Sequence, residues 1–467
     1  VGLGNIWGFP NKMGASGGFT FLVIYLVLAV LCGFIVMVGE LALGRKTRHG
    51  AVGAYKALSK KFKWMGWMGI LSAFFILFFY CALGGYCIKY TVLNIGDLFH
   101  AGFGANALAE TAAANGNSLG AEVFGAFMSS PTEAIVFGLI FVALTMVIVI
   151  GGIGGGIEKV CSVGMPALFV MLLICIIRAC TLEGAVDGLK YMFVPGWAVT
   201  NGVIEEAPGF LTVLSTAGGQ MFFSLSLGMG AMITYGSYLD KKENLQKNAI
   251  LIIVMDTLVA LMAGLCVIPG RFALDPDGAL GGPKLLFVTM QNVFSRMGGF
   301  GPIFGILFYL LVVFAAVSSS ISLLEVIVAH FVDKARNEGK GDMRKKYTFI
   351  AAAAVGVGCI LVCADRLGDA SFTPWKLLNL PAESIRTWND CWLDFWDMLS
   401  EGIMMPLGAL LMSLMFGWEV GPEVVKEECE QSGHAMGSYG FFKVCIKYIT
   451  PLIMILILYG QIKEFFF

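Results

Sequence analysis

The stretch that decides the fold opens the chain and reads Val1-Gly2-Leu3-Gly4-Asn5-Ile6-Trp7-Gly8-Phe9-Pro10. Its three glycines lower helix stability, and Pro10 lacks a backbone donor and clashes with the turn before it. The stretch therefore predicts an interrupted membrane helix, in which backbone groups of residues 3–9 lose their helical partners. At membrane depth such groups must line a cavity or be buried by protein, and there they can hold ions and polar ligands. We infer that this break is half of a substrate and ion site.

The composition indicates a membrane protein. Hydrophobic residues make up 58% of the 467 residues and charged residues only 13%, whereas a soluble domain has about 25% charged residues. The formal net charge of −1 gives no reason to expect a nucleic-acid partner. The 12 cysteines lie mostly inside apolar runs, which favours small buried side chains over a disulfide framework.

Apolar runs long enough to cross a bilayer, about 20 residues each, predict about eleven transmembrane helices. The runs lie near residues 1–15, 19–43, 66–95, 132–151, 159–181, 207–238, 246–270, 301–331, 347–364, 391–417 and 439–462. Because the first run is incomplete and begins at Val1, we expect a cytoplasmic N-terminal piece to precede it.

The basic residues predict the orientation of the chain. They gather in residues 45–63 and 334–346, whereas residues 96–131 contain no Lys or Arg. By the positive-inside rule the two basic loops are cytoplasmic. We therefore expect a multi-pass protein of the cell inner (cytoplasmic) membrane with a cytoplasmic N-terminus.

A second interruption lies in the sixth span and reads Phe222-Phe223-Ser224-Leu225-Ser226-Leu227-Gly228-Met229-Gly230. Matched breaks in the first and sixth spans point to two inverted repeats with a site at the midplane between them. On this interpretation residues 1–181 form the first repeat, 182–417 the second, and 418–467 a cytoplasmic loop and helix 11. The alternative is that glycine-rich helices pack closely or kink without binding anything.

Two long motifs carry a family resemblance. The opening stretch with Gly17-Gly18, and Gly219-Gln220-Met221 leading through the second break to Ile233-Thr234-Tyr235, resemble the neurotransmitter:sodium symporter family, bacterial amino-acid transporter branch. The resemblance implies an all-α polytopic membrane protein with inverted five-helix repeats, in which helices 1 and 6 are unwound mid-membrane. It also implies a sodium-coupled symporter and not an enzyme, in agreement with four histidines that form no HExxH pair.

The resemblance implies two sodium (Na+) sites. One would use Asn5, Ser224 and Asp256. The other would use Val1, Ala315, Ser318 and Ser319. Oxygen donors of this kind suit a hard cation. For the serines alone, the alternative is a hydrogen bond back to their own helix.

The resemblance also implies a substrate pocket. Tyr80 would bind the substrate carboxylate, although by itself it could equally be a core tyrosine. The other pocket residues would be Leu3, Gly4, Ile76, Phe223, Ser226, Gly228, Met229, Ser319 and Leu323. Most of these side chains are bulky and neutral, so we expect a neutral hydrophobic or aromatic L-amino acid as the substrate.

Asp256 departs from the family pattern, because asparagine is more frequent at that position. An ionised carboxylate at membrane depth needs a cation, a proton or a polar cavity. Chloride-dependent relatives supply a negative charge here with a bound anion, so we expect transport by this chain to be chloride-independent. The alternative is a structural ion pair.

Gating residues follow from the same resemblance. Gly8 stands where an arginine is common and Asp397 keeps the acid, so the usual outer ion pair is expected to be absent. On the inside, Tyr238 and Asp333 match residues that hold an N-terminal arginine, although Asp333 could equally be a solvated loop acid. Gly156 and Pro166 match a pattern that lets the fifth helix unwind, and the alternative is a static kink.

The function expected from these observations is sodium-driven import by alternating access, in which spans 1, 2, 6 and 7 rock against the remainder. The alternative is a membrane amino-acid sensor of the same fold that does not transport. The expected partners are a small neutral amino acid, sodium ions and the lipid bilayer, and the oligomeric state is left open.

Overall fold

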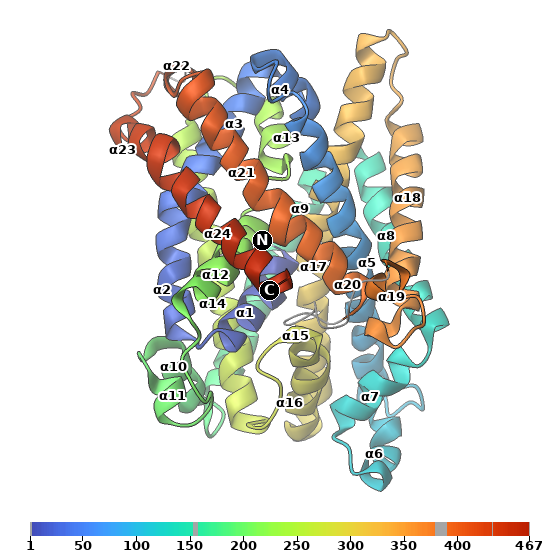
Figure 1. Cartoon of the computed structure of the whole chain (residues 1–467). Coiled ribbons are helices and arrows are strands. Elements are labelled where there is room, and N and C mark those ends of the chain that lie inside the picture. Colours follow the sequence, from blue (N-terminus) through green and yellow to red (C-terminus); the bar gives the residue numbers. More distant parts are fainter. Residues whose placement is uncertain (1, 153–156, 379–389, 432, 467) are drawn as a thin grey trace.

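The computed structural model describes residues 2–152, 157–378, 390–431 and 433–466, and every regular element in these ranges is a helix (Figure 1). Within this described part, nine helices are long and apolar enough to cross a membrane. Spans two to five contain α2 (Phe19–Leu28), η2 (Ala29–Gly33), α3 (Phe34–Thr47), α5 (Met65–Leu98), α8 (Pro131–Ile150) and α9 (Glu158–Cys180). Spans seven to nine contain α14 (Leu245–Leu274), α17 (Gly301–Asn337) and α18 (Arg344–Ala364). Spans ten and eleven contain α20 (Trp392–Asp397), η9 (Met398–Met404), α21 (Met405–Leu414), η10 (Met415–Glu419), α23 (Tyr439–Val444), η11 (Cys445–Ile449) and α24 (Thr450–Phe466).

The two predicted spans missing from these nine are the first and the sixth, which are the two with predicted interruptions. The first consists of η1 (Gly4–Gly8) and α1 (Phe9–Ala15), and the sixth of α12 (Phe210–Ser224) and α13 (Ala231–Tyr238). The all-α polytopic fold class is thereby confirmed.

The first interruption differs in form from our expectation. Gly4–Gly8 is a π-helical turn, in which the Phe9 N–H bonds the Gly4 carbonyl, and the Asn5 N–H bonds the Gly2 carbonyl at 3.1 Å. The prediction that backbone groups of residues 3–9 lose their helical partners is therefore wrong. The glycines allow the helix to widen, and it does not open. Such π-turns are frequent at functional sites.

Short helices cover both ends of the bundle (Figure 1). One end carries α4 (Ala51–Leu58) and α22 (Glu423–Glu430). Toward the opposite end lie α6 (Ala109–Asn115), α7 (Leu119–Met128), α10 (Ala185–Phe193), α11 (Trp197–Thr200) and α16 (Met290–Arg296). The remaining short elements are η3 (Ala105–Leu108), α15 (Gly282–Lys284), η5 (Leu285–Thr289), η6 (Gly298–Phe300), η7 (Arg366–Gly368) and α19 (Pro374–Leu378).

The helices α3 and α13 touch through their backbones. A Cβ atom on Gly44 of α3 would lie 1.9 Å from the Ile233 carbonyl oxygen of α13. Only glycine fits such an approach. The two helices therefore form one tightly packed pair, and α5 packs along α17.

A buried ion pair fixes the end of the bundle that carries α4. Arg45 Nε of α3 donates to Glu428 Oε1 of α22 at 2.7 Å, and both side chains are buried. Arg45 Nη1 also donates to the Glu243 carbonyl at 2.6 Å. This arginine therefore joins three segments that are far apart in the sequence.

Candidate functional site

The site lies where the first span meets the break in the sixth span. Residues 225–230 separate α12 from α13 and are not helical. Within this stretch Ser226 has φ +55°, and Gly228 and Gly230 have φ +79°. A left-handed backbone is uncommon for a residue with a side chain, and such strain concentrates at functional sites. The predicted second interruption is therefore present.

Two buried polar side chains bond the backbone at the two interruptions. Glu40 Oε1 of α3 accepts a 2.7 Å hydrogen bond from the Gly228 N–H, and Gln220 Nε2 of α12 donates to the Gly4 carbonyl at 2.7 Å. Both side chains are buried. The site residues inferred from the sequence did not include them, although a carboxylate inside an apolar run is by default a functional signal.

A small cavity of about 20 Å³ lies between the two breaks, with room for about one water molecule. Its lining residues come from the first, third, sixth and eighth spans and are Gly2, Gly4, Asn5, Tyr80, Phe223, Ser224, Ser226, Met229, Ser319 and Leu323. Seven of the ten predicted pocket residues are in this lining. Of the other three, Leu3 and Ile76 are buried and Gly228 is half-buried.

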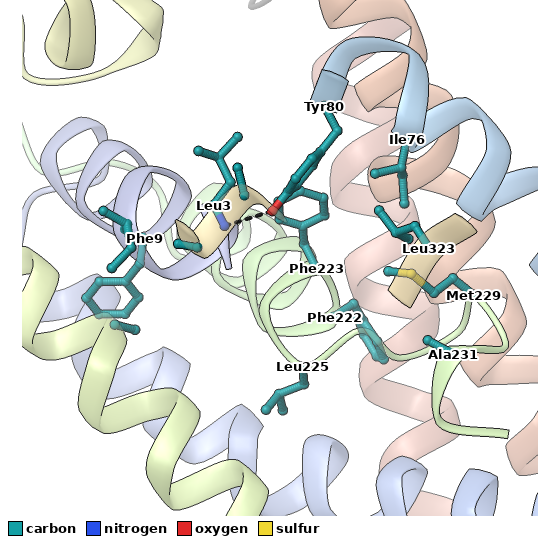
Figure 2. Packing of buried hydrophobic residues seen from close by; sticks show 14 of the residues in the cluster. Leu3, Phe9, Ile76, Tyr80, Phe222, Phe223, Leu225, Met229, Ala231 and Leu323 are labelled. Carbon is teal, nitrogen blue, oxygen red and sulfur yellow. Dashed lines mark hydrogen bonds between the residues drawn. The ribbon is translucent and has the colours of Figure 1, made fainter. Parts of the chain in front are cut away.

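One end of the cavity is polar. The Leu3 N–H donates to the Tyr80 hydroxyl at 2.8 Å (Figure 2). A Cβ atom on Gly2 would lie 1.8 Å from Ser319 Oγ and 3.1 Å from the Tyr80 hydroxyl oxygen, so these groups converge. Amides at the start of a helix carry a partial positive charge and favour an anion. This end of the cavity can therefore bind a carboxylate.

The other end is apolar. Figure 2 shows Ile76, Leu323 and Met229 grouped together, with Phe223 beside Tyr80. The Phe223 and Tyr80 ring centroids are 6.3 Å apart. None of the side chains that line the cavity is charged. The cavity therefore suits a neutral side chain.

Beside the cavity, the Asn5 amide nitrogen sits among three oxygens. Asn5 Nδ2 lies 2.7 Å from Asp256 Oδ1, 3.0 Å from the Asp256 carbonyl oxygen and 2.9 Å from Ser224 Oγ. The Ser224 hydroxyl also donates to Asp256 Oδ2 at 2.7 Å. The three residues predicted for the first sodium site are thus in direct contact, and their oxygens are the donors that a hard cation prefers.

Asp256 is buried, and among the described residues no Lys or Arg forms an ion pair with it. Its carboxylate instead accepts hydrogen bonds from the Asn5 amide and the Ser224 hydroxyl, and the Tyr25 hydroxyl also lies close to it. A carboxylate at this depth without an ion-pair partner is a suitable ligand for a bound cation.

The residues predicted for the second sodium site lie together on α17. The Ser318 hydroxyl donates to the Ala315 carbonyl at 2.9 Å, and Ser319 lines the cavity. In this conformation Ser318 therefore bonds back to its own helix. The fourth predicted ligand, Val1, lies outside the described residues.

The predicted inner gating residues have partners that the sequence did not suggest. The Tyr238 hydroxyl of α13 donates to Glu325 Oε1 of α17 at 3.0 Å, and Arg344 of α18 pairs with the same buried carboxylate. Asp333 instead accepts from the Gly50 N–H at 3.2 Å, next to α4. These contacts tie α13, α17 and α18 together at one end of the bundle.

Of the two residues predicted to form a hinge in the fifth span, one is among the described residues and the other is not. Pro166 lies inside α9, which continues through it from Glu158 to Cys180. Gly156 lies outside the described residues. The hinge pattern therefore stays a prediction.

The usual outer ion pair, between the positions of Gly8 and Asp397, is not among the ion pairs of the described residues, but a different pair joins the first and tenth spans. Lys12, one helical turn beyond Gly8, pairs with Glu401 on η9, one turn beyond Asp397. At Gly8 itself the space is taken by Gln220, whose Oε1 would be 2.8 Å from an added Cβ atom. The pair was missed because Gly8 was the only position considered for the cation.

A bundle of membrane-length helices around two interrupted ones, with backbone amides, hydroxyls and a carboxylate at their meeting point, defines a secondary membrane transporter. The family model described as the sodium:neurotransmitter symporter family matches residues 1–100 and 130–374. The chain belongs to this family.

Known proteins with similar sequences support the same assignment. The uncharacterized sodium-dependent transporter YhdH of Bacillus subtilis is 31% identical over 98% of this chain and 93% of its own length. The human sodium- and chloride-dependent transporter XTRP3 is 27% identical over 57% of this chain and 46% of its own length. These relatives are transporters and not enzymes.

A solved structure has the same fold. The crystal structure of MhsT in complex with L-phenylalanine superposes with a TM-score of 0.82 and 30% sequence identity, covering 99% of this chain and 96% of that chain. The protein is therefore a sodium-dependent transporter of the sodium:neurotransmitter symporter family.

Proposed function

We propose that this protein imports a neutral hydrophobic or aromatic L-amino acid together with sodium, by alternating access. The observation that carries the proposal is the contact between the Leu3 amide and the Tyr80 hydroxyl, which face an apolar cavity beside the oxygen cluster of Asn5 and Asp256. One site thus contains suitable partners for a carboxylate, an apolar side chain and a cation.

The amino-acid carboxylate would replace the Tyr80 oxygen as the partner of the Leu3 amide, and the Tyr80 hydroxyl would then donate to it. The side chain would lie against Phe223, Met229 and Leu323. At about 20 Å³ the cavity must expand to admit it, and the flexible Met229 side chain makes several ligand shapes possible. L-phenylalanine bound to the similar MhsT supports this substrate class.

Sodium would bind at two places. The first is the position of the Asn5 amide nitrogen, among oxygens of Ser224 and Asp256. The second lies next to Ala315, Ser318 and Ser319. Each sodium that enters down a potential of about 100 mV gains about 2.3 kcal/mol. Two ions then supply about 4.6 kcal/mol, or roughly a thousandfold accumulation.

The negative charge of Asp256 supports chloride independence. A buried carboxylate beside the first sodium position already balances the ion, so no external anion is needed there. Relatives described as chloride-dependent are found among the similar proteins, so this property would set the present chain apart from them.

The basic loops support a cytoplasmic location for the end of the bundle that carries α4, with the chain in the cell inner membrane and its N-terminus on the cytoplasmic side. The moving part would contain spans 1, 2, 6 and 7. The close contact between α3 and α13 supports a common motion of spans 2 and 6. The bond from Tyr238 to Glu325 would then close the cytoplasmic side.

Uptake into proteoliposomes tests the proposal. Purified protein would be reconstituted, and uptake of labelled L-phenylalanine, L-leucine and L-glutamate measured with and without an inward sodium gradient. We expect sodium-driven accumulation of a neutral amino acid and none of L-glutamate. Sodium-dependent binding without accumulation would support the sensor alternative, and accumulation without a sodium gradient would refute sodium coupling.

A further inference from the structure

A second cavity, which we call the α4 cavity, lies at the end of the bundle that carries α4 (Figure 1) and has a volume of about 640 Å³. It is lined by the link between α3 and α4, by α4 itself, by the start of α5 and by the last turns of α17. It shares no lining residue with the substrate cavity. The proposed transport of an amino acid therefore gives the α4 cavity no role.

Four basic side chains line the α4 cavity. They are His49 just before α4, Lys56 on α4, and His330 and Lys334 on α17. None of the four forms an ion pair with a carboxylate of the described residues. Both lysines are exposed, so their ammonium groups can reach one ligand from two different helices. Such an arrangement of cations favours an anionic ligand.

Two acids also line the α4 cavity, and each already has a partner. Asp333 Oδ2 accepts a 3.2 Å hydrogen bond from the Gly50 N–H, at the start of α4. Glu338 forms a 2.6 Å ion pair with Lys340. Because Lys340 offsets Glu338, Asp333 is left to offset only one of the two lining lysines. The cavity therefore keeps a net positive charge even when both of its histidines are neutral.

The α4 cavity lies at the level of a membrane surface. The membrane-length helices α5 and α17 begin and end beside it, at Met65 and Asn337. Trp67 lines the cavity and is 46% exposed, and its ring centroid lies 4.7 Å from that of His330. The nearby Trp64 is 49% exposed. Tryptophan is enriched at the boundary between lipid and water, and basic pockets between membrane helices bind anionic lipid headgroups. The position and the charge of the cavity therefore both favour a lipid.

We propose that the α4 cavity binds the phosphate group of an anionic phospholipid from the adjacent leaflet. Lys56 of α4 and Lys334 of α17 bind the phosphate, and Trp67 lies against the glycerol and acyl carbons. A soluble phosphate ester offers the same charge but has no acyl chains for Trp67 to contact. The bound lipid joins α4 to α17, and this role goes beyond the proposed import of an amino acid.

Native mass spectrometry of the purified full chain in neutral detergent tests the proposal. The protein is titrated with an equal mixture of phosphatidylglycerol and phosphatidylcholine, and we expect phosphatidylglycerol to bind in preference. Lys56→Gln combined with Lys334→Gln should weaken its binding about tenfold or more, because each lysine attracts an anionic lipid. The matched control is Lys345→Gln combined with Lys346→Gln, which should change the binding little. Both control lysines are exposed at the start of α18 and do not line the cavity.

Three results would overturn the proposal. The first is equal binding of the two lipids by the wild-type protein, a measurement that requires no variant to fold. The second is the same affinity for phosphatidylglycerol in the Lys56 and Lys334 double variant and in the control, each confirmed as monodisperse. The third is displacement of phosphatidylglycerol from the wild type by an equal concentration of glycerol 3-phosphate, which would assign the cavity to a soluble phosphate ester.

Discussion

Asn5 Nδ2 lies 2.7 Å from Asp256 Oδ1, and the same nitrogen reaches the Asp256 carbonyl oxygen and the Ser224 hydroxyl. An amide NH2 group that donates to three oxygens occupies the position that a small cation would take. Rotation of the amide would turn its oxygen toward the same point as another ligand, and it would break the 2.7 Å hydrogen bond that this oxygen accepts from the Gly2 N–H. The geometry thus connects the first span, the break in the sixth span and the seventh span through one ion position.

Replacing Asp256 with asparagine removes the negative charge from this position. We expect wild-type uptake of L-phenylalanine to stay within about twofold when gluconate replaces chloride, and D256N uptake in gluconate to fall about tenfold or more, because hydrogen bonds to charged groups contribute about 1.5–3 kcal/mol. Labelled uptake measures both. The control is Asp187→Asn, at an exposed acid on α10. A large loss of wild-type transport in gluconate would contradict chloride independence.

The Tyr80 hydroxyl should contribute to substrate affinity. Tyr80→Phe removes the group that accepts from the Leu3 amide, and we expect the Kd for L-phenylalanine to rise about tenfold, which corresponds to about 1.4 kcal/mol. Tyr90→Phe is a matched control on the same helix, because its buried hydroxyl has no hydrogen-bond partner among the described residues. Scintillation-proximity binding measures both variants. Equal effects of the two substitutions would rule out a specific role for Tyr80.

A methyl group at Gly2 should block the polar end of the cavity. In Gly2→Ala the Cβ atom would lie 1.8 Å from Ser319 Oγ, so the first span must shift, and we expect at least a tenfold loss of sodium-dependent L-phenylalanine binding. Gly125→Ala on α7 is the control, because no atom lies within 4 Å of its added Cβ. Normal binding by Gly2→Ala would show that this contact relaxes without affecting the site.

The Arg45–Glu428 ion pair should stabilise the fold. Glu428→Gln leaves the Arg45 charge buried without its partner, and we expect a loss of about 3–5 kcal/mol, read as a lower Tm in detergent. Arg45→Gln combined with Glu428→Gln should recover part of that loss. Lys426→Gln, at an exposed pair on the same α22, should change stability by about 1 kcal/mol or less. A Tm for Glu428→Gln equal to that of Lys426→Gln would refute the stabilising role.

The positions of the helices could be predicted because they depend on local chemistry. Twenty apolar residues require a span, and Gly228 and Gly230 take a left-handed backbone that few other residues tolerate. The same reasoning predicted the position of the first interruption correctly, but it did not predict that the interruption is a π-helical turn. Near Gly4 and Gly8 the chain instead forms a wider helical turn that keeps its backbone hydrogen bonds.

The ion pairs could not be predicted because they depend on distant contacts. Lys12 and Glu401 are 389 positions apart, and no local pattern selects one partner among several acids. Comparison with a family pattern drew attention to Gly8 and away from Lys12, one turn further on. Glu40, Glu325 and Glu401 could still have been found from the sequence, because each is a carboxylate inside an apolar run.

The touching backbones of α3 and α13 at Gly44 limit how motion in this protein can be observed. Spin labels or fluorophores attached to this pair would travel together and report a constant separation, even in a cycling protein. An informative distance measurement needs one label on α13 and the other on α5 or α17. A null result from two labels on α3 and α13 would therefore say nothing about whether the transporter opens.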